Sequence, residues 1–162
     1  MNEDDITVMA QKMGRIARKR GIFIATAESC TGGGIAAAIT RIPGSAKWFD
    51  RGFVTYHNLA KHQMLGVREE TLHKYGAVSE QVARQMAAGA LRRSQATVSV
   101  SVTGIAGPTG GSRAKPVGTV WFAWAAKGNP VQSRMFRFKG DRYEVRRQTV
   151  AMALQGIIDL LK

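Results

Sequence analysis

Apolar residues near the N-terminus recur at the spacing of one helix face. Asp4 or Asp5 can cap the start of this helix, and Gly21 can end it because glycine readily adopts a left-handed conformation. Residues 22–27 then predict a short buried strand, and after a glycine-rich turn residues 35–39 predict a closely packed helix. The apolar positions of the first helix are Ile6, Met9, Met13, Ile16 and Ala17.

The middle of the chain continues this alternation of helix and strand. Residues 49–56 predict a second strand, and helical turns are expected at 58–64 and 69–75. Ser79 predicts the cap of a longer helix whose apolar positions extend to about Leu91. This order of elements is typical of a sheet whose strands are connected by helices.

The clearest strand covers residues 97–103, where valine alternates with serine and threonine. A period of two residues places alternate side chains on opposite faces of a sheet. Because serine is small, we expect a helix to pack closely against the face on which the serines lie.

Two further strands and a long helix complete the pattern. A short turn at 127–130 separates strand candidates at 119–125 and 131–138, so we expect an antiparallel hairpin. Asp141 can cap a final helix that runs to about Leu161. The sequence contains no internal repeat and no recognisable linker, and its elements predict the α/β fold class, as a three-layer α/β/α sandwich with a mixed sheet.

Length and composition fit a single globular domain covering residues 1–162, with a normal hydrophobic content of 44%. No apolar run reaches the roughly 20 residues needed to span a bilayer, so no membrane partner is expected. The acidic N-terminus is unlike a secretory signal. A single cysteine excludes an intrachain disulfide and is typical of a reducing compartment, so we expect a cytoplasmic protein.

The charge is unusual, with 24 Lys and Arg against 11 Asp and Glu and a net charge of +13. Such an excess suits nucleic acid, an anionic surface or an anionic small substrate. Basic residues cluster at 12–20, 92–93 and 134–147, where solvated helix faces explain many of them. No zinc-finger spacing or aromatic RNA-binding signature accompanies them, so nucleic acid is not favoured as a partner.

The segment after the first strand is the first candidate for chemistry. Ser29 is followed by Cys30, Thr31 and three glycines before the next helix. In open α/β sheets, ligands bind at the carboxyl ends of strands, and backbone amides at a helix start can bind an anion. Ser29 is therefore a candidate nucleophile, although Ser29 or Thr31 could equally serve as a helix cap. The segment is neither a Walker A loop nor a G-x-S-x-G elbow.

A serine nucleophile needs a base, because its hydroxyl is protonated at neutral pH. The histidines stand in one polar stretch and suggest no oriented imidazole; they are His57, His62 and His73. Lys61 is the alternative base if burial lowers its pKa, and Tyr56 is placed to hydrogen-bond either Ser29 or Lys61. An exposed, solvated Lys61 remains the competing interpretation. Cys30 could be a rival nucleophile or a small buried hydrophobic residue.

Two later segments could bind a phosphate or a developing oxyanion. The glycine-rich loop at 103–112 can offer unhindered backbone amides, although it could also be a flexible surface loop. Arg142 and Arg146 stand in the first turns of the final helix, where the dipole attracts anions. Asp141 could alternatively be only a cap, with Arg146 paired to it. The sequence shows no cluster of His, Cys and Asp for a metal.

Several motifs together resemble one known family, the CinA C-terminal domain, from about residue 5 to residue 158. The resemblance rests on the segments Ala-Glu-Ser-Cys-Thr-Gly-Gly at 27–33, Pro-Gly-Ser at 43–45, Gly-Phe-Val-Thr-Tyr at 52–56, Lys61, Leu-Gly-Val at 65–67, Gly-Ala-Val-Ser at 76–79, Gly-Ile-Ala-Gly-Pro at 104–108 and Lys-Pro-Val-Gly-Thr-Val at 115–120. No motif is decisive alone, but as a set they are specific.

The resemblance implies a stand-alone amidohydrolase that converts nicotinamide mononucleotide to nicotinate mononucleotide and ammonia, with a sheet of about five strands. It also implies a homo-oligomer and no cofactor. The resemblance assigns the catalytic roles to Ser29, Tyr56 and Lys61. The expected substrate-binding residues are Thr31, Gly32, Gly33, Thr103, Gly104, Ala106, Gly107, Arg142 and Arg146. The alternative function is a domain that binds a nucleotide or nucleic acid without catalysis.

Overall fold

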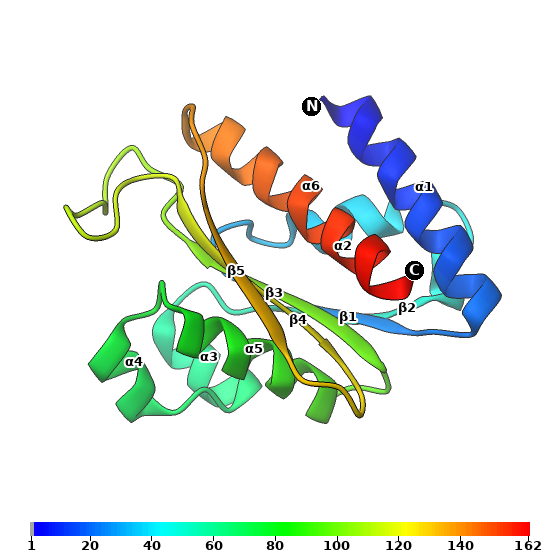
Figure 1. Ribbon diagram of the computed structural model, residues 1–162, viewed down its shortest axis with the longest axis horizontal. Coiled ribbons are helices and arrows are strands. Elements are labelled where there is room, and N and C mark those ends of the chain that lie inside the picture. The colour runs from blue at the N-terminus through cyan, green and yellow to red at the C-terminus, as the bar shows by residue number, and fades with distance from the viewer. Residues whose placement is uncertain (1) are drawn as a thin grey trace.

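A five-stranded mixed sheet separates two layers of helices in the computed structural model, which describes residues 2–162 (Figure 1). The strand order is β2-β1-β3-β4-β5; the first three strands in this order are parallel, and β4 and β5 run antiparallel to their neighbours. The strands are β1 (Ile24–Glu28), β2 (Phe49–Val54), β3 (Val98–Gly104), β4 (Thr119–Ala126) and β5 (Gln132–Arg137). The predicted fold class, number of strands and C-terminal hairpin are confirmed.

Three helices cover each face of this sheet (Figure 1). One layer consists of α1 (Glu3–Arg20), α2 (Gly34–Thr40) and α6 (Arg142–Leu161). The other consists of α3 (Asn58–Leu65), α4 (Glu69–Tyr75) and α5 (Glu80–Arg92). The predicted caps Ser79 and Asp141 are both present, since each side chain accepts a hydrogen bond from an amide of its helix's first turn.

The first helix differs from the prediction at its start. Asn2, rather than Asp4 or Asp5, is the N-cap, and its side chain accepts from the Asp5 amide while Asp5 accepts from the Asn2 amide. This reciprocal capping box satisfies two amides that a lone aspartate cap would leave open. Gly21 ends the helix with a φ of 65°, as predicted.

The serines of β3 explain the close packing of α5. The Ser99 and Ser101 hydroxyls donate to the Ala87 and Ala83 carbonyls at 2.7 and 2.6 Å. Short side chains on the sheet and alanines on the helix let the two backbones approach closely. The expectation of a helix packed on the serine face is confirmed.

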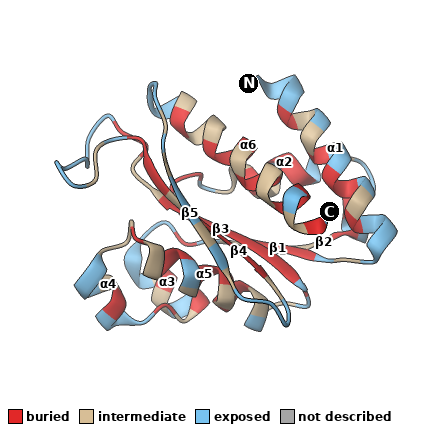
Figure 2. Ribbon diagram, viewed as in Figure 1, coloured by how far each residue is buried: buried red, intermediate tan, exposed pale blue. Residues whose placement is uncertain are grey.

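Burial divides the sheet into a buried centre and partly exposed edges (Figure 2). β1 and most of β3 are buried, whereas the edge strands β2 and β5 consist of exposed and half-buried residues. Strands covered on both faces lack the alternation of a half-exposed strand, and this is why β1 reads as a short apolar run. Within residues 2–162, no helix is both long and apolar enough to cross a membrane.

The topology gathers polar side chains at one end of the sheet. From β1 the chain passes through α2 to β2 on one side, while β3 lies on the other side of β1. The strand order β2-β1-β3 therefore reverses direction at β1. Open α/β sheets bind ligands at such switch points, beyond the carboxyl ends of their strands. Ser29 is the first residue past that end of β1.

Candidate active site

Ser29 is held by both neighbours of β1. Its amide donates to the Val102 carbonyl of β3 at 3.1 Å, while the Thr55 amide donates to the Glu28 carbonyl at 2.8 Å from the β2 side. These bonds extend the parallel ladder of β1 with β3 and that of β1 with β2 beyond the ends of the strands. The serine is 7% exposed, and these bonds fix its backbone position at the end of the sheet.

Glu28 organises the turn that follows. Its buried carboxylate accepts hydrogen bonds from the Thr31 hydroxyl at 2.5 Å and from the Ile35 and Ala36 amides at 2.8 and 3.0 Å. The cap residue of α2, Gly33, has no side chain to offer, so the end of β1 caps the helix instead. Two amides at the helix start are consequently already bonded to a carboxylate.

Lys61 is the base candidate, and it is 1% exposed. It stands in the first turn of α3, and its Nζ lies 2.9 Å from Ser29 Oγ, 2.9 Å from the Thr55 carbonyl and 3.1 Å from the Tyr56 carbonyl. Carbonyl oxygens only accept, so Lys61 donates to both of them. A neutral amine has two hydrogens for these carbonyls and one lone pair left, and that lone pair faces the Ser29 hydroxyl.

Burial also favours the neutral form of this amine. It lowers the pKa of Lys61 from its ordinary value of 10.5 to about 8, against a small opposing influence of the Cys30 thiol. The acceptors around Nζ are neutral, so desolvation of the charge is not offset by a carboxylate. A lysine with this pKa can take a proton from a serine near neutral pH.

Cys30 lies next to Ser29, but the chemical character of its side chain is different. It is 4% exposed, and burial raises the pKa of its thiol to about 12. The nearby Glu28 carboxylate acts in the same direction, and the positive charges of Lys61 and Arg146 are too weak to reverse the shift. At neutral pH the residue is a buried thiol, which favours the interpretation of Cys30 as a small hydrophobic side chain.

A cavity of about 210 Å³ opens over Ser29 and Lys61. Four of the predicted binding residues line it, and they are Thr103, Gly104, Ala106 and Arg142. Three further residues line the cavity that sequence reasoning did not single out: Asn58, Ala77 and Val78. It also did not single out Glu28, which lies behind Ser29 and outside the lining. A glutamate at the last position of a buried strand, directly before a glycine-rich helix start, was the available signal for Glu28.

Arg142 and Tyr56 form the mouth of this cavity. Arg142 donates to the Tyr56 hydroxyl and to the Gly107 carbonyl, both at 2.8 Å. The Tyr56 side chain is 58% exposed. Its carbonyl contacts Lys61, but its hydroxyl, expected at Ser29 or Lys61, points to Arg142 instead. The reason is local: the chain turns after β2, so the main chain of Tyr56 faces inward and its ring outward.

Apart from Gly107, whose carbonyl accepts from Arg142, the remaining predicted binding residues lie on the other side of the Ser29 turn. Arg146 donates to the Thr31 carbonyl at 3.1 Å and approaches Gly32, so it is paired with this turn rather than with Asp141. Gly33 has a φ of 102°, which a residue with a side chain rarely adopts. The three histidines lie outside the cavity lining, and residues 2–162 contain no group of three His, Cys, Asp or Glu able to hold a metal.

Comparison with known proteins places this geometry in a family. The model of the CinA C-terminal domain matches residues 6–161. The chain belongs to this family. It is 54% identical to the nicotinamide-nucleotide amidohydrolase PncC of Escherichia coli (strain K12), over 97% of this chain and 95% of that protein. It is 52% identical to the PncC of Pseudomonas putida, over 97% of this chain and 98% of that protein.

Solved structures of the family have the same fold. The competence/damage inducible protein CihA from Agrobacterium tumefaciens superimposes with a TM-score of 0.96 and 50% identity, covering 98% of this chain and 96% of that chain. A CinA superfamily protein from Klebsiella pneumoniae superimposes with a TM-score of 0.92 and 38% identity, covering 96% and 97%. The resemblance stated from the motifs is confirmed over nearly the whole chain.

Proposed function

We propose that this chain hydrolyses the carboxamide of nicotinamide mononucleotide, giving nicotinate mononucleotide and ammonia. The observation that carries the proposal is the buried contact of 2.9 Å between Lys61 Nζ and Ser29 Oγ. The names of the PncC relatives, which span nearly the same length, support the reaction class. A serine activated by an adjacent amine base can act as the nucleophile in acyl transfer from an amide.

In the proposed mechanism, neutral Lys61 takes the Ser29 proton as Oγ attacks the carboxamide carbon. The resulting tetrahedral intermediate collapses when the Lys61 ammonium returns that proton to the leaving nitrogen, so ammonia departs and an acyl-serine remains. Water then attacks the acyl carbon and transfers its proton to Lys61, which passes it back to Ser29 as the acid leaves. No step requires a cofactor.

The oxyanion of this intermediate needs donors, and two loops were candidates from the sequence. The Gly32 amide donates to the Ser29 carbonyl, and the first amides of α2 are bonded to Glu28. The loop at 104–107 is different, because Ala106 lines the cavity. The Ile105 amide of this loop already donates to the Thr119 carbonyl. We therefore assign the oxyanion donors to the Ala106 and Gly107 amides rather than to the Gly32–Gly33 turn.

Substrate binding in this proposal centres on Arg142. It stands at the start of α6, where the helix dipole attracts an anion, and its guanidinium is fixed by Tyr56 and Gly107. Tyr56 thereby contributes by holding Arg142 at the mouth, and its carbonyl accepts a hydrogen bond that aligns Lys61. Arg146 supports the Ser29 turn through Thr31.

The decisive experiment is to incubate the protein with nicotinamide mononucleotide and measure ammonia, with Ser29→Ala as the matched control. We expect release by the wild type and none above background by Ser29→Ala. No release by the wild type at high enzyme concentration would reject the proposal and favour a binding domain that uses the charge of +13.

Self-association and a cytoplasmic location belong to the same proposal. The first follows from the family resemblance, and light scattering of the purified protein would measure it. The second is favoured by the single free cysteine, which is typical of a reducing compartment.

A further inference from the structure

Beside the catalytic cavity, a wider cleft of about 500 Å³ opens where α1, α2 and α6 meet. Ile6, Ala37 and Val150 give it an apolar floor. Its rim is basic, with four guanidinium groups from Arg41, Arg142, Arg146 and Arg147. Arginine is the side chain best suited to phosphate, because its planar fork can bind two oxygens at once.

Two carboxylates offset this charge only in part. Glu3 pairs with Arg41 at 2.9 Å, and Glu144 pairs with Arg147 at 2.5 Å. Four arginines against these two glutamates leave a net charge of +2. The Nε of Arg147 is buried without a hydrogen-bond partner in residues 2–162, so the hydrogen bonding of this guanidinium is incomplete. The cleft therefore has unneutralised positive charge beside a guanidinium that is not fully satisfied.

The cleft continues the path from the catalytic cavity. At about 210 Å³ that cavity is smaller than the roughly 300–1,000 Å³ of pockets that enclose a whole ligand, so it can take the carboxamide ring while the rest extends outward. Arg142 lines the catalytic cavity, the cleft and a third groove of about 330 Å³. That groove carries the Asp141 carboxylate and no further cation, so an anion is better accommodated in the cleft.

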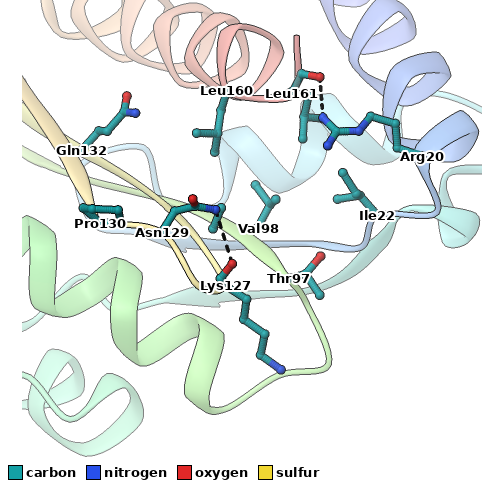
Figure 3. A pocket seen from close by; sticks show the side chains of 11 residues that line it. Arg20, Ile22, Thr97, Val98, Lys127, Asn129, Pro130, Gln132, Leu160 and Leu161 are labelled. Carbon is teal, nitrogen blue, oxygen red and sulfur yellow. Dashed lines mark hydrogen bonds between the residues drawn. The ribbon is translucent and has the colours of Figure 1, made fainter.

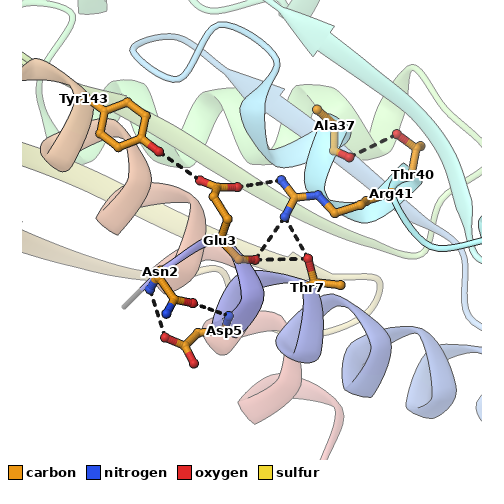
Figure 4. Close-up of polar contacts among 8 residues, drawn as sticks. All are labelled: Asn2, Glu3, Asp5, Thr7, Ala37, Thr40, Arg41 and Tyr143. Atoms are coloured by element: carbon orange, nitrogen blue, oxygen red, sulfur yellow. Dashed lines mark hydrogen bonds and ion pairs between the residues drawn. The ribbon is translucent and has the colours of Figure 1, made fainter.

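The N-terminus of α1 contacts Arg41, the arginine that an anion in the cleft would bind (Figure 4). The Glu3 carboxylate bonds Arg41 on one oxygen and lies 3.4 Å from the Tyr143 hydroxyl on the other. Arg41 also donates to the Glu3 carbonyl and to the Thr7 hydroxyl. Glu3 and Arg41 are half-exposed, so an incoming phosphate can compete for this guanidinium.

We propose that the cleft between α1, α2 and α6 binds the substrate's phosphate, with Arg41 and Arg147 as specificity-determining residues and Glu3 as a competitor that the phosphate displaces. This inference rests on the proposed function and adds the residues that distinguish a nucleotide from the corresponding nucleoside. It also predicts that the two partners of one ion pair have opposite effects on the reaction, which a purely structural pair would not have.

The test compares kcat/KM for nicotinamide mononucleotide with kcat/KM for nicotinamide riboside, which lacks the phosphate. Arg41→Gln and, independently, Arg147→Gln should each lower the nucleotide-to-riboside ratio about tenfold, since each removes a charged donor to phosphate. Glu3→Gln should raise the ratio about threefold by freeing Arg41. Lys12→Gln removes an exposed cation of α1 outside the cleft and should leave the ratio unchanged.

Three results would overturn the inference. Both arginine variants could lower kcat/KM equally for the two substrates, or Glu3→Gln could lower the nucleotide-to-riboside ratio. The third is a fall in this ratio for Lys12→Gln as large as that for Arg41→Gln. Thermal melting of each variant separates a folding defect from a change in selectivity. If the wild type releases no ammonia from either substrate, the proposed function fails instead. Calorimetry then still tests the cleft, because it measures the binding of nicotinamide mononucleotide without turnover. We expect the affinity of the double variant Ser29→Ala, Arg41→Gln to be about tenfold weaker than that of Ser29→Ala.

Discussion

The two ends of the central sheet differ in the polar groups that their cavities contain, and this difference favours the candidate site at one of them. At the end where β1 and β3 begin, a cavity of about 430 Å³ lies between the ends of α1 and α6 and the β4–β5 turn (Figure 3). At the other end the cavity over Ser29 has about half that volume. The larger cavity is lined by aliphatic side chains, uncharged polar side chains and exposed cations, whereas the smaller one contains a buried lysine against a serine hydroxyl.

The difference follows from how polar groups are satisfied at each end. In the larger cavity Arg20 donates to the Leu161 carbonyl, closing the C-terminal end of α6 much as a helix cap does. In the smaller cavity Lys61 is buried among neutral acceptors that leave its charge uncompensated. A buried group whose ionisation is disfavoured is a better indicator of chemistry than the volume of a cavity.

The largest expected effect is the loss of Ser29. Ser29→Ala should lower kcat by at least about 10³-fold, because acyl transfer loses its nucleophile while the oxyanion donors remain. Steady-state ammonia release measures kcat, and binding of nicotinamide mononucleotide by calorimetry serves as the control for an intact site. Retained turnover would move the nucleophile to another residue, with Cys30 the first to be examined.

The carboxylate of Glu28 should matter next, although it contacts no substrate in this arrangement. Glu28→Gln replaces one acceptor oxygen by an amide that cannot accept from α2, costing about 2 kcal/mol of stability. We expect kcat to fall about tenfold with little change in KM, since the Ser29 turn loses its anchor. Denaturant unfolding measures the first effect. Unchanged kcat in a folded Glu28→Gln protein would contradict the second.

The pH dependence of the wild type should report Lys61. Because burial lowers the pKa of this lysine to about 8, kcat/KM should rise about tenfold per pH unit below pH 8 and level off above it. A flat profile from pH 6 to pH 9 would contradict a role for neutral Lys61.

Stability should change with pH through the same group. The folded-state pKa of Lys61, about 8, lies below the ordinary value of 10.5, so between these values the unfolded chain binds more protons than the folded one. Stability attributable to Lys61 therefore rises as the pH rises from about 8 to 10.5, and below pH 8 the buried charge is a constant cost. Urea titrations of the wild type and Lys61→Met across this window would isolate the contribution.

Cys30→Ala should have a small effect on turnover. The buried thiol with a pKa near 12 supplies packing rather than reactivity, so kcat should stay within about threefold while stability falls by about 1 kcal/mol. An aromatic disulfide reagent should label the native thiol slowly and the unfolded thiol fast. Rapid labelling that abolishes turnover in the native protein would contradict this picture.

The smallest effect is expected at the opposite end of the sheet. Arg20→Gln removes the bond to the Leu161 carbonyl and should cost less than about 1.5 kcal/mol. Neither kcat nor KM for nicotinamide mononucleotide should change. A loss of activity comparable to that of Glu28→Gln would show that the two ends are not functionally separate.

Much of the fold was predictable from residue patterns, because period, caps and turns are local properties. The alternating valines and serines of β3, the cap at Asp141 and the hairpin are examples. The start of α1 was misassigned, since both Asn2 and the aspartates are good caps and only the reciprocal bonds of Asn2 and Asp5 decide between them.

The chemistry of the site was less predictable. Ser29 and Lys61 stand 32 residues apart, and their contact depends on the register of β1 with β2 and on the angle at which α3 leaves β2. Burial of Lys61, which changes its pKa, is a tertiary property with no local signature. The motifs of the family supplied the pairing, and the direction of the Tyr56 ring could not be read from them.

The two acceptors that align Lys61 are main-chain carbonyls, those of Thr55 and Tyr56. Substituting the side chains at these positions therefore leaves both acceptors in place, provided that the backbone keeps its path. A substitution at residue 56 would then remove the hydroxyl that holds Arg142 but leave the alignment of the base intact, so side-chain mutagenesis would overlook that alignment. Chemical synthesis of the protein with a thioamide in place of either carbonyl would test the alignment of Lys61 directly.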